Sequence, residues 1–242
     1  MKPFLLLATR AEEEAADDEY RGFLEAGGLK PDQLVRLRLD KAPLGKLDVH
    51  EYSGIIVGGS SFNTSDPVAS KSDIQLRVEN ELGDLLDRVI AADFPFLGAC
   101  YGIGLVTARL GGVVDRQWSE PPGPTAVELT AAGARDQLFG GLPPRFDAFV
   151  GHKEACSRLP EGAVLLASGP RCPVQAFRMG RNVYATQFHP ELTQESIITR
   201  IRIYKNSGYF DPSEFDDVIA EVTRSSVTEP ATIVRKFVEQ FS

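Results

Sequence analysis

The chain has 242 residues, of which 43% are hydrophobic and 25% are charged, and its formal net charge at pH 7 is −8. This balance is typical of a globular protein with a sizeable core, and the acidic charge excludes a general nucleic-acid binder, which needs a basic surface. The cysteines, Cys100, Cys156 and Cys172, are odd in number and lack C-x-x-C spacing, which excludes a disulfide framework and a zinc site of the usual kind.

The first half of the chain alternates between strand and helix patterns. Its apolar run near the N-terminus is too short for a signal peptide or a membrane span, so we expect a cytoplasmic protein without membrane contact. Buried strands are predicted over residues 4–9, 32–40, 53–58 and 94–100, and helices over residues 11–28, 72–93 and 101–112. This alternation predicts an α/β fold, an open and mostly parallel sheet with helices on both faces.

The second half begins with short strands separated by glycine and proline turns. Strands are predicted within residues 111–115, 124–130, 145–151, 163–169, 173–180 and 181–191, and we expect them to form an antiparallel extension of the sheet. Helical patterns then cover residues 192–208, 211–226 and 229–242. Because no repeat or long linker interrupts the chain, residues 1–242 are predicted to form a single domain, closed by the helices from about residue 193.

The stretch FLGACYGIG places Cys100 where a buried strand turns into a helix. The small residues Gly98, Ala99 and Gly102 allow a sharp bend, and the helix N-terminus that follows favours a thiolate. In an open α/β sheet this edge is also where ligands bind. These features favour a nucleophile at Cys100, although most free cysteines are buried packing residues and that alternative stays open at this point.

A thiol nucleophile needs a base, and His189 ends the apolar strand of YATQFHPE. Glu191, two residues later, can hold the far nitrogen of the imidazole and fix its tautomer. A lone histidine is more often a satisfied structural residue, but the neighbouring carboxylate and the strand end favour a catalytic triad of Cys100, His189 and Glu191.

The motifs FLGACYGIG and TQFHPE, in this order, resemble those of the class I, triad-type glutamine amidotransferases, and the likeness runs through most of the chain. The layout is similar to stand-alone members that match the glutaminase domain of GMP synthetase. The resemblance implies that Cys100 attacks the side-chain amide of glutamine, that His189 moves the protons and that Glu191 orients His189. It implies no metal and no cofactor.

The resemblance also assigns residues around the thiol. The segment GIIVGGSS is similar to the oxyanion loop of the family, which implies that the backbone N–H groups of Gly59 and Tyr101 hold the oxyanion. It also implies substrate contacts at Gly58, Ser60, Gly104, His152 and Glu154. For His152, a purely structural hydrogen bond is an equal alternative.

Two segments depart from the family pattern. Gly104 stands where the family usually has a substrate-holding glutamine, and Lys153 and Glu154 replace a usual glycine and aspartate. The expected function is therefore hydrolysis of glutamine to glutamate and ammonia, with a separate acceptor enzyme. A γ-glutamyl peptidase or amidase with the same triad is one alternative. A catalytically silent module that regulates a partner is the other.

Overall fold

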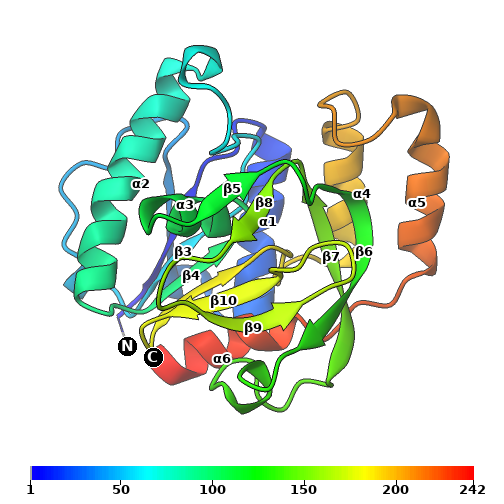
Figure 1. Cartoon of the computed structure of the whole chain (residues 1–242). Coiled ribbons are helices and arrows are strands. Elements are labelled where there is room, and N and C mark those ends of the chain that lie inside the picture. The colour runs from blue at the N-terminus through cyan, green and yellow to red at the C-terminus, as the bar shows by residue number, and fades with distance from the viewer. Residues whose placement is uncertain (1) are drawn as a thin grey trace.

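The computed structural model describes residues 2–242 and contains a nine-stranded sheet flanked by helices (Figure 1). The strands of this sheet are β1 (Phe4–Ala8), β2 (Leu34–Arg38), β3 (Ile55–Val57), β4 (Phe96–Ala99), β6 (Glu120–Leu129), β7 (Arg145–His152), β9 (Val164–Ser168), β10 (Ala176–Met179) and β11 (Val183–Thr186). The helices are α1 (Glu13–Gly27), α2 (Asp73–Ala91), α3 (Tyr101–Arg109), α4 (Gln194–Ile203), α5 (Phe215–Arg224) and α6 (Ala231–Phe241).

The strand order is β2-β1-β3-β4-β11-β10-β9-β6-β7. The first five strands in this order are parallel, and the pairs from β11 through β10, β9 and β6 to β7 are antiparallel. The α/β fold and its antiparallel extension are therefore confirmed. The strand predicted at residues 111–115 is not part of this extension: β5 (Val113–Asp115) pairs with β8 (Ala155–Arg158), which the sequence did not predict, in a separate two-stranded sheet.

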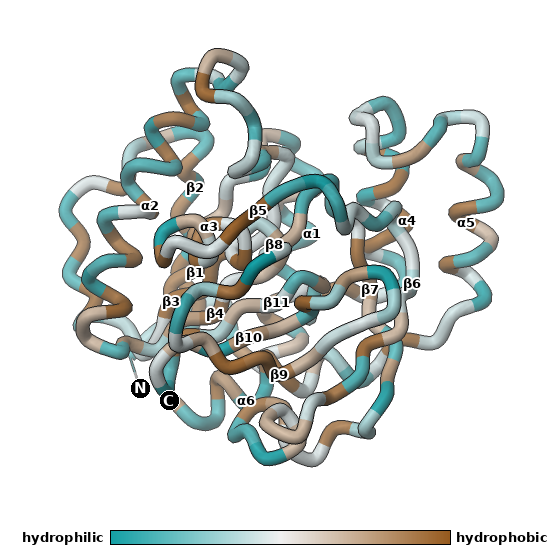
Figure 2. The backbone as a smooth tube through the Cα atoms, in the orientation of Figure 1, coloured by the Kyte–Doolittle hydropathy of each residue, from teal (hydrophilic) through white to brown (hydrophobic). Residues whose placement is uncertain are grey.

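The two faces of the sheet are buried in two apolar clusters. Along β1, Phe4 and Leu6 pack into one cluster with α1 and α6, while Leu5 and Leu7 pack into the other with α2 and α3. This alternation follows from the two-residue period of a strand, and burial on both faces explains the continuous apolar run. Figure 2 shows hydrophobic residues along the central strands.

The C-terminal helices differ in length from the prediction. α4 ends at Ile203 rather than near residue 208, and α5 begins at Phe215 after a short 3₁₀ turn at Pro212–Glu214. Gly208 has φ of 76°, a left-handed conformation that glycine adopts without strain, so the connection turns back toward the sheet. Both helices lie beside β6 and β7 (Figure 1), where they bury a small third apolar cluster.

Candidate active site

The parallel strands bring several chain segments to one edge of the sheet. In the register of β4 with its neighbours, Gly98 pairs with Val57 of β3, and Ala99 pairs with Thr186 of β11. The residues that follow β1, β3, β4 and β11 therefore meet at the carboxyl edge, where a doubly wound sheet binds its ligands.

Cys100 lies at the predicted bend, between β4 and α3. Its φ of 52° and ψ of −87° are unusual for a residue other than glycine, and its backbone N–H donates to Thr186 O at 2.8 Å. A Cβ atom on Gly98 would lie 2.9 Å from the backbone of Gly102, so this bend requires a glycine. Strain of this kind is stored where a side chain must be presented outward, and the thiol of Cys100 lines a cavity.

His189 reaches the same cavity from the end of β11. Its backbone N–H donates to Phe149 O at 2.9 Å, and its ring Nδ1 lies 2.9 Å from Glu191 Oε1. His189 and Glu191 are both buried. Since Nδ1 of His189 is hydrogen-bonded to the carboxylate of Glu191, Nε2 is the ring nitrogen left to exchange a proton with the thiol.

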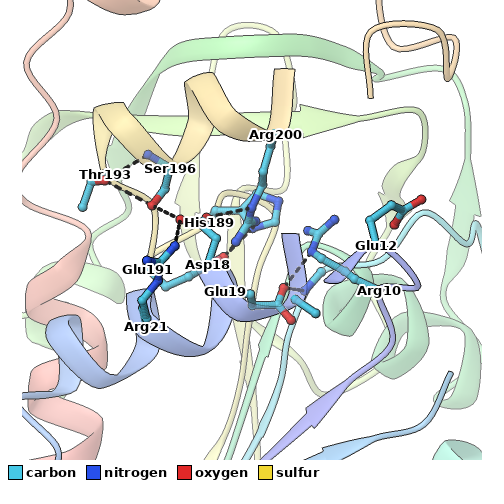
Figure 3. A network of polar contacts seen from close by, with 12 residues as sticks. Arg10, Glu12, Asp18, Glu19, Arg21, His189, Glu191, Thr193, Ser196 and Arg200 are labelled. Atoms are coloured by element: carbon cyan, nitrogen blue, oxygen red, sulfur yellow. Dashed lines mark hydrogen bonds and ion pairs between the residues drawn. The ribbon is translucent and has the colours of Figure 1, made fainter. Parts of the chain in front are cut away.

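Two buried arginines, which the sequence prediction did not single out, complete this cluster (Figure 3). Arg200 of α4 donates from Nη1 to Glu191 Oε1 at 3.1 Å, and Arg10, just after β1, donates from Nε to Glu19 Oε1 at 3.0 Å. Arg10 follows a predicted strand directly, so its place at the carboxyl edge was readable. Nothing local in the sequence marked Arg200.

Burial and these charges set the ionisation of the candidate triad. Desolvation lowers the pKa of His189 to about 4, although Glu191 opposes this shift, and desolvation raises the pKa of Cys100 to about 12. Burial opposes ionisation of Glu191, but His189 and Arg200 outweigh it and lower its pKa. The resting pair is therefore a neutral thiol and a neutral imidazole beside an ionised carboxylate.

The glycine loop after β3 differs from the predicted arrangement. The Gly59 N–H donates to Glu19 Oε1 at 2.9 Å, which points this donor away from the thiol, and a Cβ on Gly58 would lie 2.4 Å from Glu19. Within residues 2–242, neither the Ser60 N–H nor the Tyr101 N–H has a hydrogen-bond acceptor, and Ser60 lines the cavity with Cys100. Because Ser60 lines the cavity beside Cys100, its N–H is a free donor on the same loop as the predicted Gly59.

The remaining predicted substrate contacts are used within the protein. His152 is buried, with Nδ1 3.0 Å from Glu154 O and Nε2 3.1 Å from Glu120 Oε2, so the structural alternative describes it. Glu154 accepts bonds from the Thr64 N–H, the Thr64 hydroxyl and the Ser65 N–H at 2.7–2.8 Å. A Cβ at Gly104 would lie 3.0 Å from Thr64 Oγ1 and 3.2 Å from Glu154 Oε1. A side chain at position 104 would therefore begin in close contact with Thr64 and Glu154.

The cavity beside Cys100 is small, about 40 Å³. The segment after α4 forms part of its wall through Tyr204, Tyr209 and Phe210. Lys153 holds this segment, since its ammonium donates to Ser207 O at 3.3 Å and lies 4.7 Å from the centre of the Tyr209 ring. The cavity is therefore smaller than most ligand pockets, which measure about 300–1,000 Å³, and this segment forms one of its walls.

Cys156 and Cys172 are buried away from the cavity lining, and residues 2–242 contain no group of three histidine, cysteine or acidic side chains placed to hold a metal. Among the helices that the structure describes, none combines the length and the apolar composition needed to span a membrane.

Comparison with known proteins gives a consistent result. The model of the family described as "Glutamine amidotransferase class-I" matches residues 36–201. Curated relatives include the glutamine-hydrolyzing GMP synthases of Syntrophomonas wolfei, 32% identical over 138 residues, and Streptomyces avermitilis, 37% identical over 128 residues. These matches cover 55% and 51% of this chain but only 26% and 24% of the relatives, so the chain corresponds to about a quarter of their length.

Solved structures extend the likeness over the whole chain. A glutamine amidotransferase from Thermotoga maritima superimposes with a TM-score of 0.77 at 19% identity, covering 100% of this chain and 98% of its own. A glutamine amido transferase from Methylobacillus flagellatus gives a TM-score of 0.75 at 18% identity, with coverage of 100% and 96%. At these identities the superpositions establish the shared fold.

Proposed function

Since this chain belongs to the class I glutamine amidotransferase family, we propose that it hydrolyses a side-chain amide through Cys100, His189 and Glu191. The observation that carries the proposal is the placement of Cys100 on a strained bend, in one cavity with a histidine whose far nitrogen is held by a buried carboxylate. We propose further that residues 1–242 work as one amidotransferase domain.

In the proposed mechanism, the thiol of Cys100 transfers its proton to His189 Nε2 as the sulfur attacks the amide carbonyl. The tetrahedral oxyanion is held by the N–H groups of Tyr101 and Ser60, which have no acceptor within residues 2–242. Collapse breaks the C–N bond, His189 returns the proton to the leaving ammonia, and a thioester forms. Water, deprotonated by His189, then hydrolyses the thioester and restores the thiol.

The test is release of ammonia from glutamine, with mass-spectrometric detection of the acyl-enzyme. Replacement Cys100→Ala is expected to abolish both signals, whereas Cys156→Ala, a control at a buried cysteine outside the cavity, retains them. Ammonia release by the Cys100→Ala variant at the wild-type rate would refute the mechanism. Failure of a glutamine analogue such as diazo-oxo-norleucine to label Cys100 would favour the silent regulatory module.

A second candidate has the same triad and a different substrate, a γ-glutamyl peptide or amide. It is supported by the absence of a side-chain amide at Gly104 and by the engagement of Glu154 with the loop at Thr64, because both remove contacts expected for free glutamine. Comparing kcat/KM for glutamine with that for γ-glutamyl dipeptides separates the two candidates.

We also propose that ammonia made from glutamine passes to an acceptor enzyme outside these 242 residues. The curated relatives are named as glutamine-hydrolyzing GMP synthases, and the chain matches about a quarter of their length. Transfer of ¹⁵N from amide-labelled glutamine to the product of an added synthetase is the measurement. Absence of the label from that product, while ammonia is still released, would contradict the proposed transfer.

A further inference from the structure

Arg200 reaches the histidine–glutamate pair from the side of α4. This helix begins three residues after Glu191, with the Thr193 hydroxyl accepting from the Ser196 N–H, and two turns later it presents Arg200 to the pair. The arginine is 6% exposed. Its Nη1 lies 3.1 Å from Glu191 Oε1 and 3.2 Å from His189 Nδ1, as Figure 3 shows.

Two groups, His189 and Arg200, therefore meet at a single carboxylate oxygen of Glu191. A guanidinium has only N–H donors and the Nδ1 proton also points to this oxygen, so Glu191 Oε1 accepts from both. The same geometry sets a positive charge 3.2 Å from the imidazole. A second proton on the ring would be repelled by it, and in a buried site that repulsion is only weakly screened.

Two carboxylates face the guanidinium of Arg200, but only Glu191 forms a hydrogen bond with it. Its Nε and Nη2 atoms have no hydrogen-bond partner within residues 2–242, and the nearest additional carboxylate, Asp18 of α1, lies 3.7 Å from Nε. Asp18 is itself engaged, because its Oδ1 accepts from the Ser196 hydroxyl at 2.9 Å. The other charged or titratable groups around this cavity and ion-pair network are Arg10, Glu12, Glu19, Arg21, Cys100, Glu154, Tyr204 and Tyr209.

We propose that Arg200 is a positioning residue that keeps Glu191 ionised and His189 in its neutral, proton-accepting form. The inference rests on the proposed function, since it concerns the base of that reaction. A neutral imidazole can take the thiol proton at once, and an imidazolium destabilised by Arg200 gives the proton quickly to the departing amine. The role is one that the family motifs, which end at Glu191, do not include.

The first test is the pH dependence of kcat/KM for ammonia release. Replacement Arg200→Met removes the charge and keeps an apolar chain of similar length. Because protonated His189 is then no longer repelled, the acidic limb, which is the pH range where kcat/KM falls as His189 becomes protonated, is expected to move upward by about one pH unit. Replacement Arg200→Lys keeps the charge and is expected to hold the limb within about half a unit of wild type. Arg202→Met, at an exposed arginine on the same helix, is the matched control and leaves the limb unchanged.

Asp18→Asn gives a shift of opposite sign, because removing this carboxylate leaves Arg200 less balanced and lowers the acidic limb. This variant keeps an oxygen for the Ser196 hydroxyl and so tests the charge if Arg200→Met fails to fold. An unmoved limb in folded Arg200→Met, or equal shifts in the Met and Lys variants, would overturn the proposal.

A second readout does not depend on turnover. The chain has only three histidines, so the His189 ring can be assigned and titrated by NMR in the Cys100→Ala background. Adding Arg200→Met is expected to raise the measured pKa of His189 by about one unit, and an unchanged titration would overturn the inference. If the Cys100→Ala protein still releases ammonia, the proposed function fails while this titration still decides the role of Arg200.

Discussion

Glu154 could serve the loop beside the thiol or bind the substrate, and the structure predicts the first of these roles. The carboxylate is 8% exposed and accepts three hydrogen bonds from Thr64 and Ser65. It ties the loop that carries Ser60 to the turn between β7 and β8. Removing it is expected to loosen this loop, and with it the free Ser60 N–H, rather than to remove a direct contact with substrate.

The magnitude follows from these contacts. Hydrogen bonds to a charged acceptor contribute about 1.5–3 kcal/mol each, but they are not additive and Thr64 is partly exposed, so Glu154→Ala is expected to cost about 3 kcal/mol of unfolding free energy. Glu154→Gln keeps the shape and one accepting oxygen and is expected to cost about half as much. Thr64→Val removes only the hydroxyl bond and is expected to cost about 1 kcal/mol.

Urea unfolding of the wild type, Glu154→Ala, Glu154→Gln, Thr64→Val and the double variant Glu154→Ala/Thr64→Val gives these values. The double variant should be less destabilised than the sum of the single variants by about 1 kcal/mol, because both remove the same hydrogen bond. For glutamine we expect kcat to fall more than KM rises. An unfolding free energy within about 0.5 kcal/mol of wild type, together with a tenfold rise in KM alone, would show that Glu154 binds substrate and refute the reasoning.

Three further predictions concern the thiol and its cavity. Because the pKa of His189 is lowered to about 4, its neutral form persists well below pH 6. The fall of kcat/KM at acidic pH should therefore have its midpoint below the ordinary histidine pKa of about 6.5, and a midpoint at or above that value would contradict this expectation. Gly104→Gln should lower the unfolding free energy by about 1–2 kcal/mol without lowering KM for glutamine. This cost should be smaller when it is measured in a Thr64→Ala background, because the close contact with the Thr64 hydroxyl is then absent. Lys153→Ala removes a contact to the segment after α4 and should speed the labelling of Cys100 by iodoacetamide, measured by mass spectrometry. The increase should be at most about fivefold, because one exposed contact is worth at most about 1 kcal/mol. Slower labelling would contradict the view that this segment shields the thiol.

The local arrangement of the candidate site was predictable wherever one short segment determines it. Small residues around Cys100 specify a bend between a strand and a helix, and the H-P-E order sets a carboxylate beside the imidazole of His189, two residues away. The parallel sheet was equally readable, because alternating apolar strands and amphipathic helices have only a few ways to bury their faces.

Tertiary contacts decided what local patterns could not. The Gly59 N–H, which the sequence assigns to the oxyanion, is engaged by Glu19, which lies 40 residues away. Glu154 is likewise drawn to Thr64, 90 residues away. In both cases a buried polar group is satisfied by a partner distant in sequence, and spacing along the chain carries no information about that partner.

The sequence by itself determined the parallel sheet, the sharp bend at Cys100 and the pairing of His189 with Glu191, because these depend on residue size, periodicity and near neighbours. Only the tertiary structure decided that Arg200 joins the pair and that the chain after α4 forms a wall of the cavity. The reason is physical: the charge on a buried group and the space beside a thiol are set by every element that packs around them, including helices that come later in the chain.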